Sequence, residues 1–124
     1  MEILTTSGAP KAIGPYSQGI KEGRWIFASG QVPLDPATGK LVEGDFEAKV
    51  RRVFANLRAV LASGGAEFRH VVKATVFLKS MTDFPALNAV YSEELGGHKP
   101  ARSTVAVAGL PLDAPVEIEL IAIV

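Results

Sequence analysis

The chain of 124 residues has no cysteine, which excludes a disulfide framework, a thiolate metal site and a thiol nucleophile. Its 13 basic and 13 acidic residues cancel, so the chain has no strong basic field to attract nucleic acid. The start, Met1–Thr5, lacks the basic residues and apolar run of a signal peptide, and no stretch approaches the length of a membrane span. We therefore expect a cytoplasmic protein that binds neither nucleic acid nor a membrane.

What the chain does have is the composition of a globular protein, with 48% hydrophobic and 21% charged residues. Its length favours a single domain over 1–124. Asp45 and Asp83 precede two helical patterns, and glycine pairs beginning at Gly64 and Gly96 follow them, as is typical of helix starts and ends. The predicted elements are, in order, a hairpin at 18–29, a helix at 45–63, a strand at 71–78, a helix at 83–95, and strands at 100–108 and 115–124.

Several predicted strands are apolar on both sides. Along 71–78, one side carries Val72, Ala74, Val76 and Leu78, and the other carries Val71, Thr75 and Phe77. Two helices cover only one face of a sheet, so we expect both helices on one face and another subunit on the second. The residues predicted to be covered by neighbouring chains are Ala106, Ala108, Ile121 and Ile123.

Arg102 and Glu117 carry charge within the last two predicted strands, 100–108 and 115–124, which are otherwise mostly apolar. If Val105 and Ile118 lie on the same face of the sheet, the alternation of side chains along each strand puts Arg102 and Glu117 together on the opposite face. One interpretation is a cross-strand salt bridge, worth under about 1 kcal/mol if exposed. The other is a functional pair, because a guanidinium suits a carboxylate ligand and a partly buried glutamate suits proton transfer.

Three other segments place polar groups where a ligand could use them. Tyr16 follows a rigid Gly-Pro pair, although a tyrosine in such a place is more often a half-buried packing residue. Ser29 and Gly30 end an apolar strand, which ordinary turn chemistry also explains. Asn88 lies in the middle of a predicted helix, where asparagine is unfavourable unless its amide is used.

Four motifs, in this order along 9–124, resemble those of the Rid family of reactive intermediate deaminases, also labelled endoribonuclease L-PSP. They are Gly14-Pro15-Tyr16-Ser17-Gln18-Gly19, Ala28-Ser29-Gly30-Gln31-Val32-Pro33, Pro100-Ala101-Arg102-Ser103-Thr104 and Pro115-Val116-Glu117-Ile118-Glu119. The resemblance implies an α+β, chorismate-mutase-like fold: a mixed sheet with two helices packed on one face, assembling as a trimeric barrel. It also implies active sites between the subunits of a homotrimer.

The implied activity is hydrolytic deamination of 2-imino acids, such as 2-iminopropanoate and 2-iminobutanoate, to 2-oxo acids and ammonia. By this resemblance, Arg102 holds the substrate carboxylate, and Glu117 positions or activates the attacking water. The reaction needs no metal or organic cofactor, because the imine is already electrophilic.

The resemblance also assigns the remaining polar residues to the substrate pocket. Tyr16 encloses the substrate, Ser29 and Gly30 lie beside it, and Asn88 lines the site. Thr104 is a departure, because many relatives carry cysteine there. Backbone groups at that position contact the substrate in the family, so we expect Thr104 to preserve hydrolysis and to exclude thiol chemistry.

Two other functions stay open. One is an endoribonuclease or translation inhibitor, as the older family label implies. The other is a non-catalytic trimer that binds a small ligand and does not require Glu117.

Overall fold

The computed structural model describes all residues, 1–124, and contains six strands and two α-helices. Their bounds are β1 (Glu2–Leu4), β2 (Gly19–Glu22), β3 (Trp25–Gln31), α1 (Phe46–Ser63), β4 (Val71–Leu78), α2 (Phe84–Glu94), β5 (Ala101–Ala106) and β6 (Val116–Ile123). Short 3-10 turns lie at Phe68–His70, Met81–Asp83 and Pro111–Asp113. The three-residue strand β1 is the element that the sequence pattern missed.

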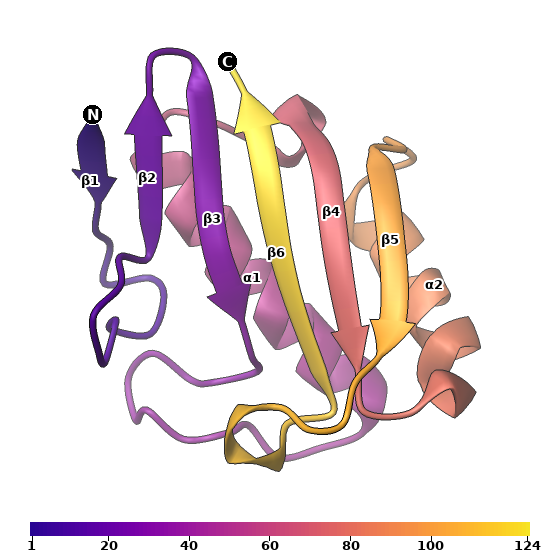
Figure 1. Cartoon of the computed structure of the whole chain (residues 1–124). Coiled ribbons are helices and arrows are strands. Elements are labelled where there is room, and N and C mark those ends of the chain that lie inside the picture. Colours follow the sequence, from indigo (N-terminus) through magenta and orange to yellow (C-terminus); the bar gives the residue numbers. More distant parts are fainter.

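The strands form one sheet in the order β1-β2-β3-β6-β4-β5. Every neighbouring pair is antiparallel except β4 and β5, which are parallel and are connected through α2. Figure 1 shows both helices behind the sheet, on the same face. The predicted α+β architecture, with a mixed sheet and two helices on one face, is therefore confirmed. None of the helices is both long and apolar enough to cross a membrane.

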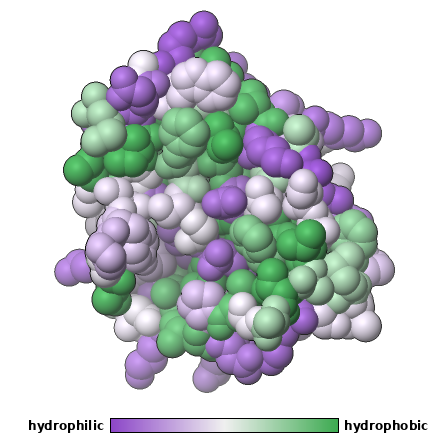
Figure 2. Space-filling view, in the orientation of Figure 1, coloured by the Kyte–Doolittle hydropathy of each residue, from purple (hydrophilic) through white to green (hydrophobic).

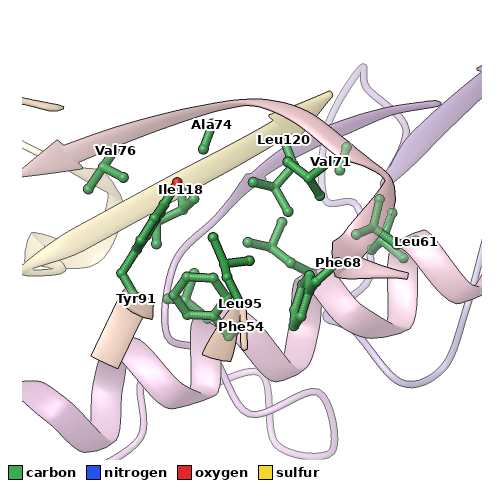
Figure 3. Close-up of a cluster of buried hydrophobic side chains, with 14 of the residues drawn as sticks. Phe54, Leu61, Phe68, Val71, Ala74, Val76, Tyr91, Leu95, Ile118 and Leu120 are labelled. Atoms are coloured by element: carbon green, nitrogen blue, oxygen red, sulfur yellow. The ribbon is translucent and has the colours of Figure 1, made fainter. Parts of the chain in front are cut away.

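The hydrophobic core lies between the helices and this face. Asp45 caps α1, because its Oδ1 accepts a hydrogen bond of 2.8 Å from the Ala48 N–H. At the centre of the core, the Phe54 ring meets Phe68 and Tyr91 edge-on, with centroids 5.6 and 5.9 Å apart (Figure 3). On β6, the residues that face the helices are Val116, Ile118, Leu120 and Ala122.

A β-bulge corrects the predicted faces of β4. The pairing of β4 with β6 shifts between Val71 and Lys73. The extra residue turns Val71 into the core, where it is 1% exposed, and turns Val72 outward, where it is 39% exposed. The expectation that Val72 shares a side with Ala74 is wrong for this reason.

The opposite face of the sheet is open and carries large apolar side chains. Trp25, Phe27 and Val105 are each 45 or 46% exposed. Figure 2 looks onto this face and shows apolar patches between polar ones. Ala106 does not belong to it, because Ala106 pairs with the buried Leu78 and so lies on the helix side. The predicted grouping of Ala106 with residues of the open face is therefore wrong.

Candidate functional site

Glu117 lies on the open face of β6, beside the end of β3. It lines a cavity of about 370 Å³ together with Tyr16, Gly30 and Leu112. A Cβ atom added to Gly30 would lie 2.7 Å from Glu117 Oε2 and 2.9 Å from its Cδ. No side chain fits there while the carboxyl group keeps its place. The absence of a side chain at Gly30 therefore leaves room for the Glu117 carboxyl group.

The Glu117 carboxyl group makes no hydrogen bond or ion pair within the chain. Burial raises its pKa above the ordinary value, and the nearby charge of Glu119 raises it further. A raised pKa brings proton exchange by this carboxyl group closer to neutral pH than in an ordinary glutamate, and the cavity gives a ligand access to it.

Tyr16 reaches the same cavity from the N-terminal segment and is 55% exposed. Its N–H bonds the Gly14 carbonyl at 3.0 Å, in a turn where Gly14 has a φ of 128°. Gln18, only 5% exposed, holds this segment in place. Its Nε2 donates to the Pro10 carbonyl at 2.7 Å, and its Oε1 accepts from the Thr6 N–H at 2.8 Å. The sequence motif contained Gln18, but the pattern gave no sign of this supporting role.

Ser29 lies next to Gly30, but its polar groups bind the chain itself. Its hydroxyl donates to the Ser17 carbonyl at 2.6 Å, and its N–H donates to the Gln18 carbonyl at 3.0 Å. These bonds connect the end of β3 to the segment that carries Tyr16. Ser29 therefore brings Gly30 and Tyr16 together, and its contact with a ligand stays a prediction.

Arg102 lies on the other face of the sheet, against α2. Its Nη1 donates to Asn88 Oδ1 at 2.8 Å. Its guanidinium carbon lies 4.7 Å from the ring centroid of Tyr91 and 5.5 Å from that of Phe84. Asn88, Tyr91 and Arg102 are among the residues that line a second cavity of about 500 Å³. The mid-helix asparagine thus uses its amide, as its unfavourable position indicated.

The strand register shows that Arg102 and Glu117 point to opposite sides. Arg102 pairs with Ala74 of β4, whereas Glu117 pairs with Phe77 of the same strand. Residues three apart on a strand face opposite ways. β4 also separates the two strands, so a salt bridge between Arg102 and Glu117 is excluded within one chain. The expectation of a shared face is wrong because Val105, through its partner Phe77, lies on the Glu117 side.

Thr104 lies two residues beyond Arg102 on the same side of β5 and pairs with the buried Val76. Its Oγ1 and the Tyr91 hydroxyl are both buried without a hydrogen-bond partner. Burial raises the pKa of Tyr91, and the positive charge of Arg102 acts in the opposite direction. The structure therefore brings together Arg102, Asn88 and Thr104 in one group, and Tyr16, Gly30 and Glu117 in another.

The cavity beside Glu117 is also lined by Leu112, a residue that the sequence pattern did not single out. Leu112 is 63% exposed. Leu112 and Asp113 have φ values of 57° and 56°, a left-handed conformation that non-glycine residues rarely adopt. Asp113 is held by an ion pair with Lys79, at 2.7 Å.

The two histidines are engaged by the backbone. Nδ1 of His70 accepts from the Glu67 N–H at 2.9 Å, and Nε2 of His98 bonds the Val71 carbonyl at 2.7 Å. No group of three or more histidine, aspartate or glutamate residues is arranged to hold a metal ion.

Comparison with known proteins agrees with these motifs. The family model described as Endoribonuclease L-PSP matches residues 6–124. The chain belongs to the Rid family. A solved structure from Thermotoga maritima is 52% identical with a TM-score of 0.98, covering 100% of this chain and 98% of that one.

Two further Rid-family relatives bear on chemistry. A mouse protein named 2-iminobutanoate/2-iminopropanoate deaminase is 43% identical over 98% of this chain and 90% of its own length. Escherichia coli TdcF, solved with bound serine, is 38% identical with a TM-score of 0.95, covering 100% of this chain and 99% of that one.

Proposed function

We propose that this Rid protein hydrolyses 2-imino acids to 2-oxo acids and ammonia. The observation that carries the proposal is the Glu117 carboxyl group, which has no partner, a raised pKa and an open cavity that it shares with Tyr16 and Gly30. The name of the 43% identical mouse relative supports the same reaction. The bound serine of TdcF supports a small amino-acid-like ligand.

The proposed site is shared between two chains of a homotrimer. Arg102 and Glu117 face opposite sides of one sheet, so one chain does not offer both to the same small ligand. A neighbouring subunit that covers the open apolar face would bring its own Arg102 toward the Glu117 cavity. Exposed Trp25, Phe27 and Val105 supply apolar surface for such an interface. Barrel-like association of three sheets then gives three equivalent sites.

Hydrolysis proceeds in two proton-balanced steps. In the first, the oxygen of water forms a bond to the imine carbon while the carbon–nitrogen double bond becomes a single bond, and Glu117 accepts a proton from that water and passes it to the nitrogen. In the second, Glu117 accepts the proton of the hydroxyl group of the tetrahedral intermediate and passes it to the amino nitrogen. The carbon–nitrogen bond breaks, the hydroxyl oxygen becomes the carbonyl oxygen of the 2-oxo acid, and the nitrogen leaves as ammonia. The raised pKa of Glu117 suits a group that must both accept and donate protons.

Arg102 holds the substrate carboxylate through its planar donor fork. Its bond to Asn88 uses one part of that fork and fixes the orientation of the rest. Tyr16 and Gly30 enclose the reacting carbon on the Glu117 side. Thr104 leaves the site without a thiol, and the two steps require none.

The test generates 2-iminopropanoate or 2-iminobutanoate in situ with an amino-acid oxidase and follows its disappearance by competition with a trapping amine. Wild-type protein should shorten the imine lifetime, and Glu117→Gln should not. The solution mass, measured in parallel by light scattering, should be that of a trimer. An unchanged imine lifetime with folded wild-type protein would reject the proposal.

Two alternatives stay open, the first of them named in the family description, and the same preparations separate them from imine hydrolysis. An endoribonuclease would cleave RNA, with an affinity that falls steeply as salt rises. A non-catalytic binding trimer would bind a carboxylate ligand equally well with and without Glu117 and would show no turnover in either form.

A further inference from the structure

We propose that Tyr91 and Phe84 are positioning residues, which hold the Arg102 guanidinium in the orientation that receives a substrate carboxylate. The inference rests on the proposed function, because it takes Arg102 as the carboxylate-binding group. It assigns to α2 a role in ligand affinity that is separate from its role in the hydrophobic core.

The spacing along α2 builds a surface for one guanidinium. Phe84, Asn88 and Tyr91 are four and three residues apart, so they lie on the same face of the helix. Strand β5 runs alongside, and its pairing with β4 turns Arg102 toward that face. All three helix side chains contact the same group: two through their rings and one through a hydrogen bond of 2.8 Å.

The contacts leave part of the guanidinium free. The guanidinium carbon lies over both rings, and an aromatic ring attracts the cation through its π system without supplying an oxygen or nitrogen acceptor for the N–H donors. Asn88 accepts from Nη1 alone. The remaining N–H groups are free to form a two-pronged contact with a carboxylate. The rings thus restrict the rotation of a long side chain without competing for its donors.

Tyr91 contributes through its ring. Its hydroxyl is buried and has no hydrogen-bond partner, and the ring reaches from α2 to the underside of the sheet, as Figure 3 shows. The hydroxyl therefore does not hold Arg102 by a hydrogen bond. Tyr91→Phe keeps the ring, whereas Tyr91→Leu removes it and retains an apolar side chain in the core. This pair of variants separates positioning from other roles of Tyr91.

The experiment measures the dissociation constant of pyruvate, used as a carboxylate probe, together with KM and kcat for 2-iminopropanoate. Wild type gives the full affinity for pyruvate, and Arg102→Ala gives the affinity without the guanidinium. We expect Tyr91→Leu to weaken pyruvate binding and raise KM by about five- to tenfold, with little change in kcat. Phe84→Leu should show a smaller change in the same direction, because its ring lies farther away. Tyr91→Phe should stay within about twofold of wild type.

The control is Leu87→Ala, at a fully buried position of the same helix. It lowers stability through the core and should leave KM unchanged. Equal losses of pyruvate affinity in Leu87→Ala and Tyr91→Leu would overturn the proposal. It would also be overturned if Tyr91→Leu bound pyruvate as tightly as wild type while Arg102→Ala did not bind it. If Tyr91→Leu does not fold, Phe84→Leu decides alone, and wild-type affinity there overturns the proposal. Equal pyruvate binding by wild type and Arg102→Ala would instead reject the carboxylate site of the proposed function.

Discussion

Gly30 and Glu117 are in such close contact that the carboxyl group occupies the space where a side chain at Gly30 would lie. A Cβ atom at Gly30 would be 2.7 Å from Glu117 Oε2. The two residues come from β3 and β6, which are paired neighbours in the sheet with an irregular register between Ala28 and Gln31. That irregularity brings the backbone of Gly30 against the carboxyl group.

Gly30→Ala should therefore lower imine hydrolysis by about 10-fold or more, because the carboxyl group must move from its position. The melting temperature should change little, because the displaced carboxyl group borders a cavity and can move into it. Steady-state hydrolysis and thermal unfolding of the same sample check both. Gly109→Ala is the matched control, because nothing lies within 4 Å of a Cβ there and Gly109 has no positive φ. Full activity in Gly30→Ala would contradict the placement of Glu117 as the reacting group.

The sequence predicted the elements well and the site only in part. The α1 pattern, its Asp45 cap and the two-sided apolar strands are local signals, and the structure contains all three. The faces of Arg102 and Glu117 depend on which strand β5 joins. β5 pairs with β4, in parallel, although β6 follows it in the chain. Strand order is a long-range property, so alternation within each strand could not decide it.

Glu117→Gln should raise stability at neutral pH, because burial and Glu119 disfavour the charged carboxylate in the folded chain. A raised folded pKa means that the folded state binds a proton more tightly than the unfolded state does. Stability from this group is complete below its unfolded pKa and is lost as pH rises through the folded pKa. Melting temperatures from pH 4 to pH 8 should therefore show an advantage of Glu117→Gln that disappears toward the acid end. An advantage independent of pH would exclude the charge as its cause.

Leu112→Asn should stabilise the protein by about 1 kcal/mol, because asparagine tolerates the left-handed conformation better than leucine does. Leu112 has a φ of 57° and is 63% exposed, so little apolar burial is lost. Chemical denaturation measures the change. Leu110→Asn is the control, since Leu110 has a φ of −129° and gains nothing from the substitution. A lower unfolding free energy for Leu112→Asn would show that its apolar contacts outweigh the backbone strain.

A shared site makes a strong prediction about mixtures of inactive variants. Arg102→Ala lacks the carboxylate-binding group, and Glu117→Gln lacks the proton-transfer group, so each homotrimer should be inactive. The proposed site takes Arg102 from one chain and Glu117 from its neighbour. In a mixed trimer, both residues are therefore intact wherever a Glu117→Gln chain supplies Arg102 and an Arg102→Ala chain supplies Glu117.

Co-expression of the two variants in equal amounts, with different affinity tags to purify the mixed trimers, should therefore restore activity. Each purified mixed trimer contains both variants in a ring of three, so the right order occurs once and roughly a third of its sites are intact. Mixing separately purified homotrimers that do not exchange subunits is the control and should give none. The opposite orientation of Arg102 and Glu117 on one sheet is the reason to expect recovery. A mixed trimer without activity would mean that each site takes both residues from the same chain, which requires a rearrangement of β5 relative to β6.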